Sequence, residues 1–278
     1  MNDRVTVTIS DGIADVVMNR PDKRNALDGE QFLAIARAGE RLKSEPSVRA
    51  VVLSGAGSSF CAGLDFSSFQ AMGSATNGDS DLLEADGSPG SIQPGGITHL
   101  GQQVCWVWQE LAVPVIAAVH GHALGGGLQI ALGADIRIVH PTTQLSVREV
   151  HWGLVPDMTG TLMLTQLVRP DIAKELTFSA RVFDGDYALS IGLATSLSDS
   201  PYESAMNLAR QIASQSPDAV RGSKALFNGL LHERAVAQFA AERRVISSLI
   251  GHPNQIEAIM ANFEKRTPQF SDPSTSNG

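Results

Sequence analysis

The first part of the chain shows hydrophobic positions at the spacing of a strand and then at that of a helix. Apolar and polar residues alternate over residues 5–9, an Asp-Gly pair supplies a turn, and residues 13–18 form a second apolar run. After Asp28, a residue type that favours helix N-caps, apolar residues recur at helical spacing until Pro46. The pattern predicts a β-hairpin followed by an amphipathic helix.

Short apolar runs and helical patterns alternate in the middle of the chain. Because strands buried on both faces carry continuous apolar residues, we expect strands at residues 49–53 and 111–119. Shorter patterns predict strands at 134–139 and 144–150, and helices at 98–111, 128–132 and 158–168. This alternation is typical of an α/β fold.

The end of the chain has a wholly helical pattern. Apolar positions keep helical spacing from residue 201 to residue 266, with breaks at Pro217 and Pro253. We therefore expect an α/β core at residues 1–197 and a helical C-terminal part at residues 198–278.

Residues 73–96 interrupt this order. They are rich in Gly, Ser, Asp and Pro and have no apolar period, so we expect a mobile surface loop. A loop of this length inside a domain is usually functional, and this one is a candidate substrate lid.

The composition is that of a folded, acidic protein. Of 278 residues, 43% are hydrophobic and 18% charged, and 21 Lys+Arg against 29 Asp+Glu give a net charge of −8. Because there is no overall basic field, we expect no nucleic-acid partner. The most apolar stretch is far shorter than the ~20 residues that span a bilayer, and no secretory signal is visible. We therefore expect no membrane segment and a cytoplasmic location.

Cysteine and histidine give only weak signals of chemistry. Cys61 and Cys105 are too few for a disulfide framework or a zinc cluster, so we expect both to be buried as small apolar residues. His120 and His122 have no third ligand nearby, so we expect strand-end packing and no metal site.

Three glycines, Gly125-Gly126-Gly127, follow an apolar run and lead into a predicted helix. They can expose backbone N–H groups beside the positive end of a helix dipole, where an anion is stabilised. A dinucleotide fingerprint fails, because Ile130 stands where its last glycine belongs. The sequence also lacks the serine-hydrolase elbow and the phosphate-binding P-loop motif.

Several motifs together resemble the crotonase family of enoyl-CoA hydratases and isomerases. In chain order they are Asn19-Arg20-Pro21, Arg24-Asn25-Ala26-Leu27, Ser54-Gly55-Ala56-Gly57, Phe60-Cys61-Ala62-Gly63-Leu64-Asp65, His120-Gly121-His122-Ala123-Leu124-Gly125-Gly126-Gly127, Glu149-Val150 and Gly153-Leu154-Val155-Pro156. The resemblance covers nearly the whole chain. It implies a spiral of ββα units with a C-terminal helical trimerisation region, assembled as homotrimers or homohexamers.

The resemblance also implies the chemistry that the family shares, which is stabilisation of a thioester enolate. By motif position, the backbone N–H groups of Leu64 and Gly126 form the oxyanion hole that holds the acyl oxygen. The substrate is then an acyl-CoA thioester, and coenzyme A is part of the substrate, not a separate cofactor. The alternative is that both segments are merely tight turns of an α/β domain.

Proton transfer is expected at the positions where the family's hydratases carry two carboxylates. Here these positions are Gln129 and Glu149. An amide cannot transfer a proton, so Gln129 could only orient a water or a carbonyl, and Glu149 is the expected base. Alternatively, Glu149 is a solvated carboxylate beside Arg148.

Asp157 is a point of resemblance to the dienoyl-CoA isomerases of the family, which carry aspartate at this position, whereas the hydratases usually carry glycine. Glu149 and Asp157 would suit a reaction that removes a proton at one carbon and returns one at another. Those isomerases generally also carry aspartate at the position of Gln129, so neither subfamily pattern is complete. Asp157 could instead be the N-cap of a helix that begins near Met158.

Binding of the CoA moiety is expected near one basic loop. The resemblance implies contacts with Arg24, Ala26, Ala62 and Asp65, and with Lys265 near the C-terminus. Solvated surface charge is the alternative for each basic residue. Candidate walls of an acyl pocket, which could equally be core residues, are Phe66, Phe69, Met72, Trp106, Trp108 and Trp152.

We therefore expect an enzyme that isomerises a double bond of an enoyl- or dienoyl-CoA. Hydration of a 2-trans-enoyl-CoA to a 3-hydroxyacyl-CoA is the close alternative, and other reactions of the family stay open. Because Gln129 replaces a carboxylate, a non-catalytic acyl-CoA binder is a second class of function.

Overall fold

A computed structural model describes residues 4–73 and 96–272 of the protein. Its main sheet has six strands in the order β1-β2-β3-β4-β6-β8, with bounds β1 Val5–Ser10, β2 Ile13–Met18, β3 Ala50–Gly55, β4 Val115–Val119, β6 Ile136–Val139 and β8 Ser196–Leu197. β1 and β2 form the predicted antiparallel hairpin, and the other neighbours are parallel. The predicted lid at residues 73–96 lies, apart from its two ends, outside the described residues.

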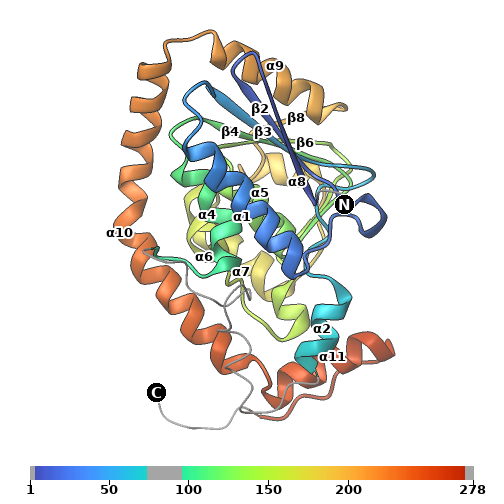
Figure 1. The fold of residues 1–278 in the computed structure, drawn as a ribbon. Coiled ribbons are helices and arrows are strands. Elements are labelled where there is room, and N and C mark those ends of the chain that lie inside the picture. Colours follow the sequence, from blue (N-terminus) through green and yellow to red (C-terminus); the bar gives the residue numbers. More distant parts are fainter. Residues whose placement is uncertain (1–3, 74–95, 273–278) are drawn as a thin grey trace.

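Helices cover both faces of this sheet (Figure 1). Alternate residues of β3 face opposite layers, so Val51 and Leu53 join the main core while Ala50 and Val52 pack under the C-terminal helix α9 (Pro201–Ala213). The helices on the core side or near it are α1 Gly29–Lys43, α4 Leu100–Glu110, α5 Gly126–Gly133, α6 Gly160–Leu167, α7 Pro170–Ser179 and α8 Gly185–Ser190. The predicted N-cap of α1 is confirmed, since the Asp28 side chain accepts from the Gln31 N–H.

A second, two-stranded sheet and the extended segments bridged to it position the candidate site. Strands β5 His122–Leu124 and β7 Gln144–Ser146 pair in parallel. Single bridges extend this pair through Cys61 to Ala123 and, farther out, from Leu27 to Leu64. The turn of helix η1 Pro21–Lys23 thereby lies in the same layer as the glycine run.

The C-terminal part is helical, as predicted, with α9 Pro201–Ala213, α10 Pro217–Leu249 and α11 Pro253–Glu264. α10 is 33 residues long and runs along one side of the molecule, while α11 packs against α2 Phe66–Gly73 (Figure 1). Phe239 of α10 is fully buried and meets Trp106 of α4 edge to face, with ring centroids 5.0 Å apart. The described residues do not test the predicted division into residues 1–197 and 198–278, which stays a prediction. None of the described helices has the length and apolarity needed to cross a membrane.

Two predicted strands are shorter than expected. Residues 111–114 do not belong to β4, because Pro114 has no N–H for a central ladder and the Val113 carbonyl accepts from Lys224 Nζ. The strand expected at residues 144–150 ends at Ser146, and Glu149–Trp152 forms the 3₁₀ helix η2, closed by Gly153 at φ 70°. This turn directs Glu149 toward the glycine run.

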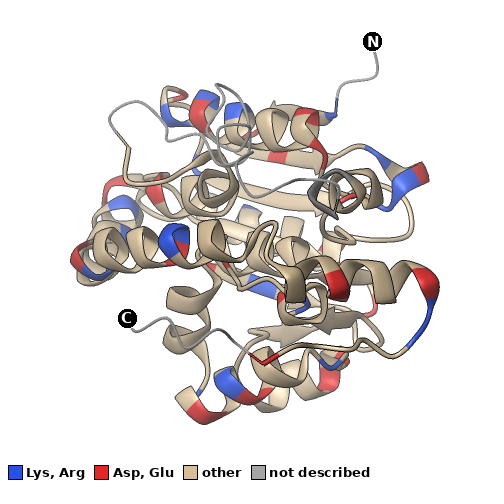
Figure 2. Ribbon diagram, turned by 90° about the horizontal axis from the view of Figure 1, so that it is seen from below, with Lys and Arg blue, Asp and Glu red and all other residues tan. Residues whose placement is uncertain are grey.

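Charged residues are interspersed along the outer elements. Figure 2 shows acidic and basic positions side by side on many helices. Buried Lys224 is paired, since its ammonium group donates to Asp135 at 2.7 Å.

Candidate active site

The Leu64 amide is oriented by its own peptide unit. The Gly63 carbonyl accepts from the Leu27 N–H at 2.8 Å, and the Asp65 N–H donates to the Leu27 carbonyl at 2.9 Å. In a trans peptide the N–H points opposite to the C=O, so the Leu64 N–H points away from Leu27. This amide is therefore available on the other side of the segment.

The glycine run lies on that other side. A β-carbon on Gly63, at φ 89°, would stand 2.5 Å from the Leu124 carbonyl oxygen and 3.9 Å from the Gly126 nitrogen. Gly126 is the first residue of α5, and the Gly125 carbonyl accepts from the Gln129 N–H, so the Gly126 N–H points out of the helix N-terminus. The two predicted oxyanion-hole segments are thus neighbours, a close approach that only glycine at position 63 permits.

Glu149 lies beside the same turn. A β-carbon on Gly125 would be 3.2 Å from Glu149 Oε1. The side chain is buried and its Oε2 has no hydrogen-bond partner among the described residues. Burial raises the pKa of Glu149 to about 7, which contradicts the alternative of a solvated carboxylate.

Gln129 connects Glu149 to the turn that follows Asp157. Its Nε2 donates to Glu149 Oε1 at 2.6 Å, and its Oε1 accepts from the N–H groups of Met158 and Gly160 at 3.0 and 2.9 Å. Both ends of the amide are therefore engaged with protein groups. Gln129 therefore orients the Glu149 carboxyl group and the turn that follows Asp157.

Asp157 faces the same region, with its side chain 24% exposed. Burial, followed by the charges of Glu242 and Glu149, raises the pKa of Asp157 to about 8. Its Oδ2 lies 3.9 Å from His99 Nε2, and burial lowers the pKa of His99 to about 4. The N-cap alternative for Asp157 is wrong, because α6 starts at Gly160 after an N-cap at Thr159.

Sequence reasoning missed two residues near Asp157. His99 is buried and caps α4, where its Nδ1 accepts from the Gln102 N–H at 3.0 Å. Glu242 is buried on α10. No motif includes either residue. Glu242 falls at helical spacing with Ala235, Phe239 and Ile246, and a carboxyl on this apolar stripe could have been predicted to be buried.

The segments expected to bind CoA meet in one place. The Ala62 N–H donates to the Arg24 carbonyl at 2.9 Å, and Arg20 Nη1 donates to the Ala26 carbonyl at 3.0 Å and to Asp65 Oδ2 at 2.6 Å. Neighbouring Asn25 is fully buried and holds this loop through its side chain. The Asp65 carboxylate is thus engaged by Arg20.

Lys265 belongs to a different part of the fold. It forms the C-cap of α11, in a left-handed conformation, and is exposed. Contact of Lys265 with CoA stays a prediction.

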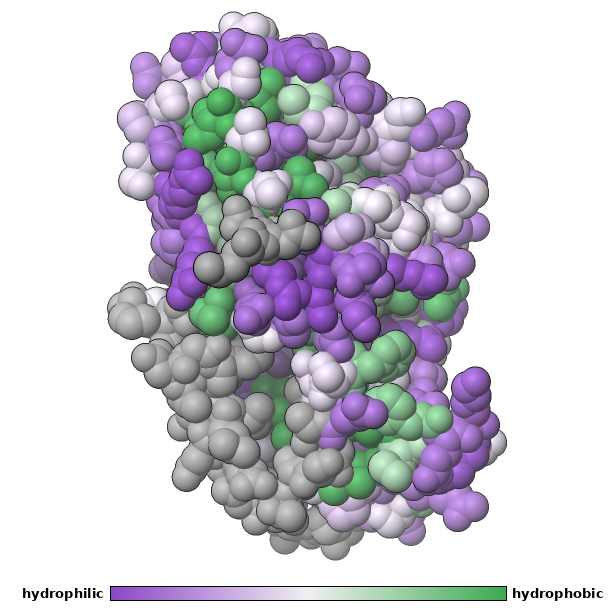
Figure 3. Space-filling model, turned by 45° about the vertical axis from the view of Figure 1, so that its right-hand side comes forward, coloured by the Kyte–Doolittle hydropathy of each residue, from purple (hydrophilic) through white to green (hydrophobic). Residues whose placement is uncertain are grey.

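The candidate acyl-pocket residues divide into two groups. Trp106 and Trp108 are core residues, 5% and 0% exposed. Phe69 instead stacks on Trp152 with centroids 4.0 Å apart, and Phe66 meets Trp152 and Phe263 edge to face. Phe66 is 65% exposed, and Figure 3 shows hydrophobic residues on the lower part of the molecule, where α2 and α11 lie. The Met72 side chain is outside the described part.

The two histidines and two cysteines considered in the sequence analysis have structural partners or are buried. His120 Nε2 pairs with the Gly57 carbonyl at 3.0 Å and His122 Nδ1 with Ser59 Oγ at 2.9 Å. Cys61 and Cys105 are free and buried, as predicted. Over residues 4–73 and 96–272, no three His, Cys, Asp or Glu side chains are grouped so as to hold a metal ion.

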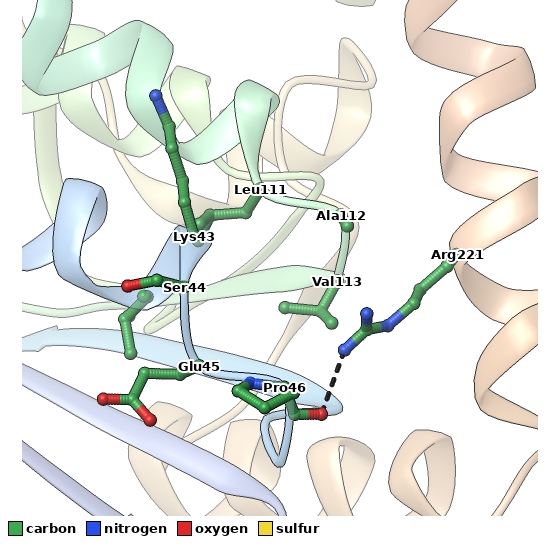
Figure 4. Close-up of a pocket in the computed structure, with 9 residues that line it drawn as sticks. Lys43, Ser44, Glu45, Pro46, Leu111, Ala112, Val113 and Arg221 are labelled. Atoms are coloured by element: carbon green, nitrogen blue, oxygen red, sulfur yellow. Dashed lines mark hydrogen bonds between the residues drawn. The ribbon is translucent and has the colours of Figure 1, made fainter.

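Two cavities lie away from this site. One of about 260 Å³ is lined by the end of α1, the α4–β4 connection and Arg221 of α10, which donates to the Pro46 carbonyl at 3.3 Å (Figure 4). A larger one of about 600 Å³ lies between α9, α10 and the end of the sheet, beside Lys224 and Phe227. Neither includes Glu149 or Asp157.

Comparisons with known proteins agree on one family. The sequence matches the family described as enoyl-CoA hydratase/isomerase over residues 13–276. It is 33% identical to the short-chain-enoyl-CoA hydratase of Clostridium acetobutylicum (91% of this chain, 92% of the relative) and 31% identical to the mitochondrial methylglutaconyl-CoA hydratase of Mus musculus (93% and 79%). It is 30% identical to the peroxisomal Delta(3,5)-Delta(2,4)-dienoyl-CoA isomerase of Arabidopsis thaliana (92% and 91%).

The fold agrees with these matches. A solved enoyl-CoA hydratase/isomerase from Pseudoalteromonas atlantica superposes with a TM-score of 0.82 at 29% identity, covering 96% of this chain and 100% of that one. One from Mycobacterium paratuberculosis gives 0.83 at 25% identity, covering 94% and 98%. The predicted crotonase-like α/β fold is thereby confirmed, and the chain belongs to the enoyl-CoA hydratase/isomerase family.

Proposed function

We propose that the protein shifts a double bond within an enoyl- or dienoyl-CoA thioester. The observation that carries the proposal is the pair of carboxyl groups, Glu149 and Asp157, with pKa values raised to about 7 and about 8. Carboxyl groups whose pKa values lie near neutral pH can serve as base and acid. Membership of the family supports a CoA thioester as substrate.

The reaction proceeds through an enolate. Ionised Glu149 removes a proton from the acyl chain, and the electron pair moves onto the thioester oxygen, which accepts from the Leu64 and Gly126 N–H groups. Asp157 then donates its proton to a carbon farther along the acyl chain. This restores the thioester carbonyl and leaves the double bond at a new position. Proton exchange with solvent then restores both groups.

The environment of Gln129 favours this reaction over hydration. Hydration needs a second group that holds and activates water. Both ends of the Gln129 amide are already bound to Glu149 and to the N–H groups of Met158 and Gly160. Hydration of a 2-trans-enoyl-CoA remains the second candidate, because the hydratases of Clostridium acetobutylicum and Mus musculus are similar over most of the chain.

Assays on 3,5-dienoyl-CoA and 2-trans-enoyl-CoA test the proposal. We expect isomerisation of the dienoyl substrate, with Glu149→Gln and Asp157→Asn each lowering kcat by about 10²–10⁴-fold. If the protein adds water rapidly to 2-trans-enoyl-CoA, and Asp157→Asn keeps this activity, the protein is a hydratase and not an isomerase. Tight acyl-CoA binding without turnover of either thioester would show that the protein is only a binder.

We propose in addition that CoA lies along the loop of Arg24 and Ala26, with Lys265 near its phosphates, and that the protein assembles as trimers or paired trimers. Three residues of α10, Leu226, Phe227 and Leu230, expose 78%, 73% and 77% of their surface. An apolar surface of this kind is typical of an interface between subunits.

A further inference from the structure

Glu242 is a buried carboxyl that the proposed mechanism does not use. It is 3% exposed, and its Oε2 accepts from Gln102 Nε2 at 2.9 Å and from the Thr159 N–H at 3.1 Å. Its Oε1 accepts from the N–H and the hydroxyl of Thr161 at 3.3 and 2.5 Å. The Thr161 hydroxyl is free to donate because it accepts from Gln238 Nε2. Four donors suit an ionised carboxylate, which can only accept.

Glu242 and Gln129 hold the same turn from two sides. The N–H groups of residues 158 and 160 donate to Gln129, and those of residues 159 and 161 donate to Glu242. These groups lie at the start of α6, where a helix leaves its N–H groups without backbone partners. Two side chains from α5 and α10 therefore fix the backbone immediately after Asp157.

We infer that Glu242 is a positioning residue of the active site, which fixes the turn that carries Asp157 and places a negative charge beside the Asp157 carboxyl. Asp157 is thereby held as the proton donor of the proposed reaction. The inference rests on the proposed function only for the role of Asp157 in catalysis. The effect of the Glu242 charge on Asp157 does not depend on the presence of substrate.

The other charged and titratable groups around Asp157 are consistent with this role. From α4, His99 and Cys105 are neutral near pH 7, since burial lowers the pKa of the first and raises that of the second. From α10, Arg243 donates to the Ile97 carbonyl and to Gln102. From η2, Glu149 adds a second negative charge when ionised. Burial raises the pKa of Glu242 above its ordinary value, and its four hydrogen bonds offset only part of this effect.

Infrared titration of the substrate-free protein tests the charge effect. The carboxylic-acid C=O band that Asp157→Asn removes should disappear with a midpoint near pH 8 in the wild-type protein. Glu242→Gln should lower this midpoint by on the order of one pH unit, because a nearby like charge is removed. Glu233→Gln, at an exposed position of the same helix, is the matched control and should leave it unchanged. An unchanged midpoint in folded Glu242→Gln would overturn the inference.

Glu242→Asp tests the positioning effect and remains informative if Glu242→Gln does not fold. It keeps the charge but shortens the side chain, so we expect the Asp157 midpoint to stay near the wild-type value. The kcat for isomerisation should fall by about tenfold or more at unchanged KM, because small displacements of catalytic groups are costly. A wild-type kcat would contradict the positioning role. A midpoint shift in Glu242→Gln without any isomerase activity would contradict only the proposed function.

Discussion

At Gln129, one amide makes contacts that a carboxylate could not make. It donates to Glu149 and accepts from two backbone N–H groups, whereas an ionised carboxylate has no proton to donate. The sequence shows this departure from the hydratase pattern but not its consequence, because the partners of Gln129 lie about 20 and 30 residues farther along the chain. The residues that match motifs, Glu149 and Asp157, were predictable from sequence. Glu242 was not, because its role depends on where α10 packs.

The raised pKa of Asp157 makes the stability of the protein depend on pH. Its value of about 8 in the folded protein lies above the ordinary 3.8, so the stabilising contribution is complete below 3.8 and is lost as pH rises through 8. Between about pH 4 and pH 9, the Tm of Asp157→Asn should therefore fall less than the Tm of the wild-type protein. The difference should be about 2–4 °C for each kcal/mol that ionisation of the buried Asp157 carboxyl costs. Thermal unfolding across this range measures the effect.

Asp186→Asn is the matched control, because Asp186 is an exposed residue at the start of α8. The Tm of the Asp186→Asn variant should decline with rising pH in parallel with the Tm of the wild-type protein. Parallel curves for Asp157→Asn as well would mean that Asp157 ionises in the folded protein as easily as in the unfolded chain.

At the scale of elements, the ends of the predicted helices agree with the structure better than the ends of the predicted strands, although α2, α7 and α8 were not predicted at all. Helix ends depend on local signals, such as Asp28 before α1 and the prolines that start α10 and α11, and these signals are complete within a few residues. Strand ends depend on the neighbouring strand. The end of β7 at Ser146 therefore could not be obtained from an apolar run that continues past it.

Helix α10 brings Glu242 to the turn after Asp157 because one stripe of the helix packs on the core. Phe239 is fully buried against Trp106, and its carbonyl accepts from Gln102, which also donates to Glu242. Phe239→Ala should destabilise the protein by about 3–5 kcal/mol through the cavity it leaves. Because Glu242 lies one turn away, kcat should fall as well, although Phe239 belongs to the core.

Chemical denaturation and steady-state kinetics of this variant measure both effects. Phe178→Ala, which removes a ring that is 72% exposed on α7, is the control and should change neither quantity appreciably. Loss of stability in Phe239→Ala with an unaltered kcat would show that α10 supports the fold without supporting the site.

At the scale of the whole molecule, the site is assembled from segments spread over most of the sequence. The proposed oxyanion-hole amides come from the Leu64 segment and α5, the proposed base from η2, the proposed acid from the turn before α6, and hydrogen bonds to that turn from α10. The helical C-terminal part therefore has a face toward the site as well as the apolar surface proposed for assembly. Motif matching could locate the first four segments, whereas the fifth becomes visible only when the chain is folded.

The apolar surface of α10 leads to a prediction about assembly. Leu226 and Leu230 lie one turn apart and are 78% and 77% exposed, so a second copy of the chain would remove both from water. The wild-type protein should sediment as a trimer or hexamer, and Leu230→Asp should shift it toward monomers, because a buried, unpaired charge costs several kcal/mol at an interface. Leu189→Asp, on α8, is the control, since Leu189 is also exposed but lies away from α10. Sedimentation of Leu230→Asp as the wild-type assembly, with unchanged circular dichroism, would place the subunit interface elsewhere on the molecule.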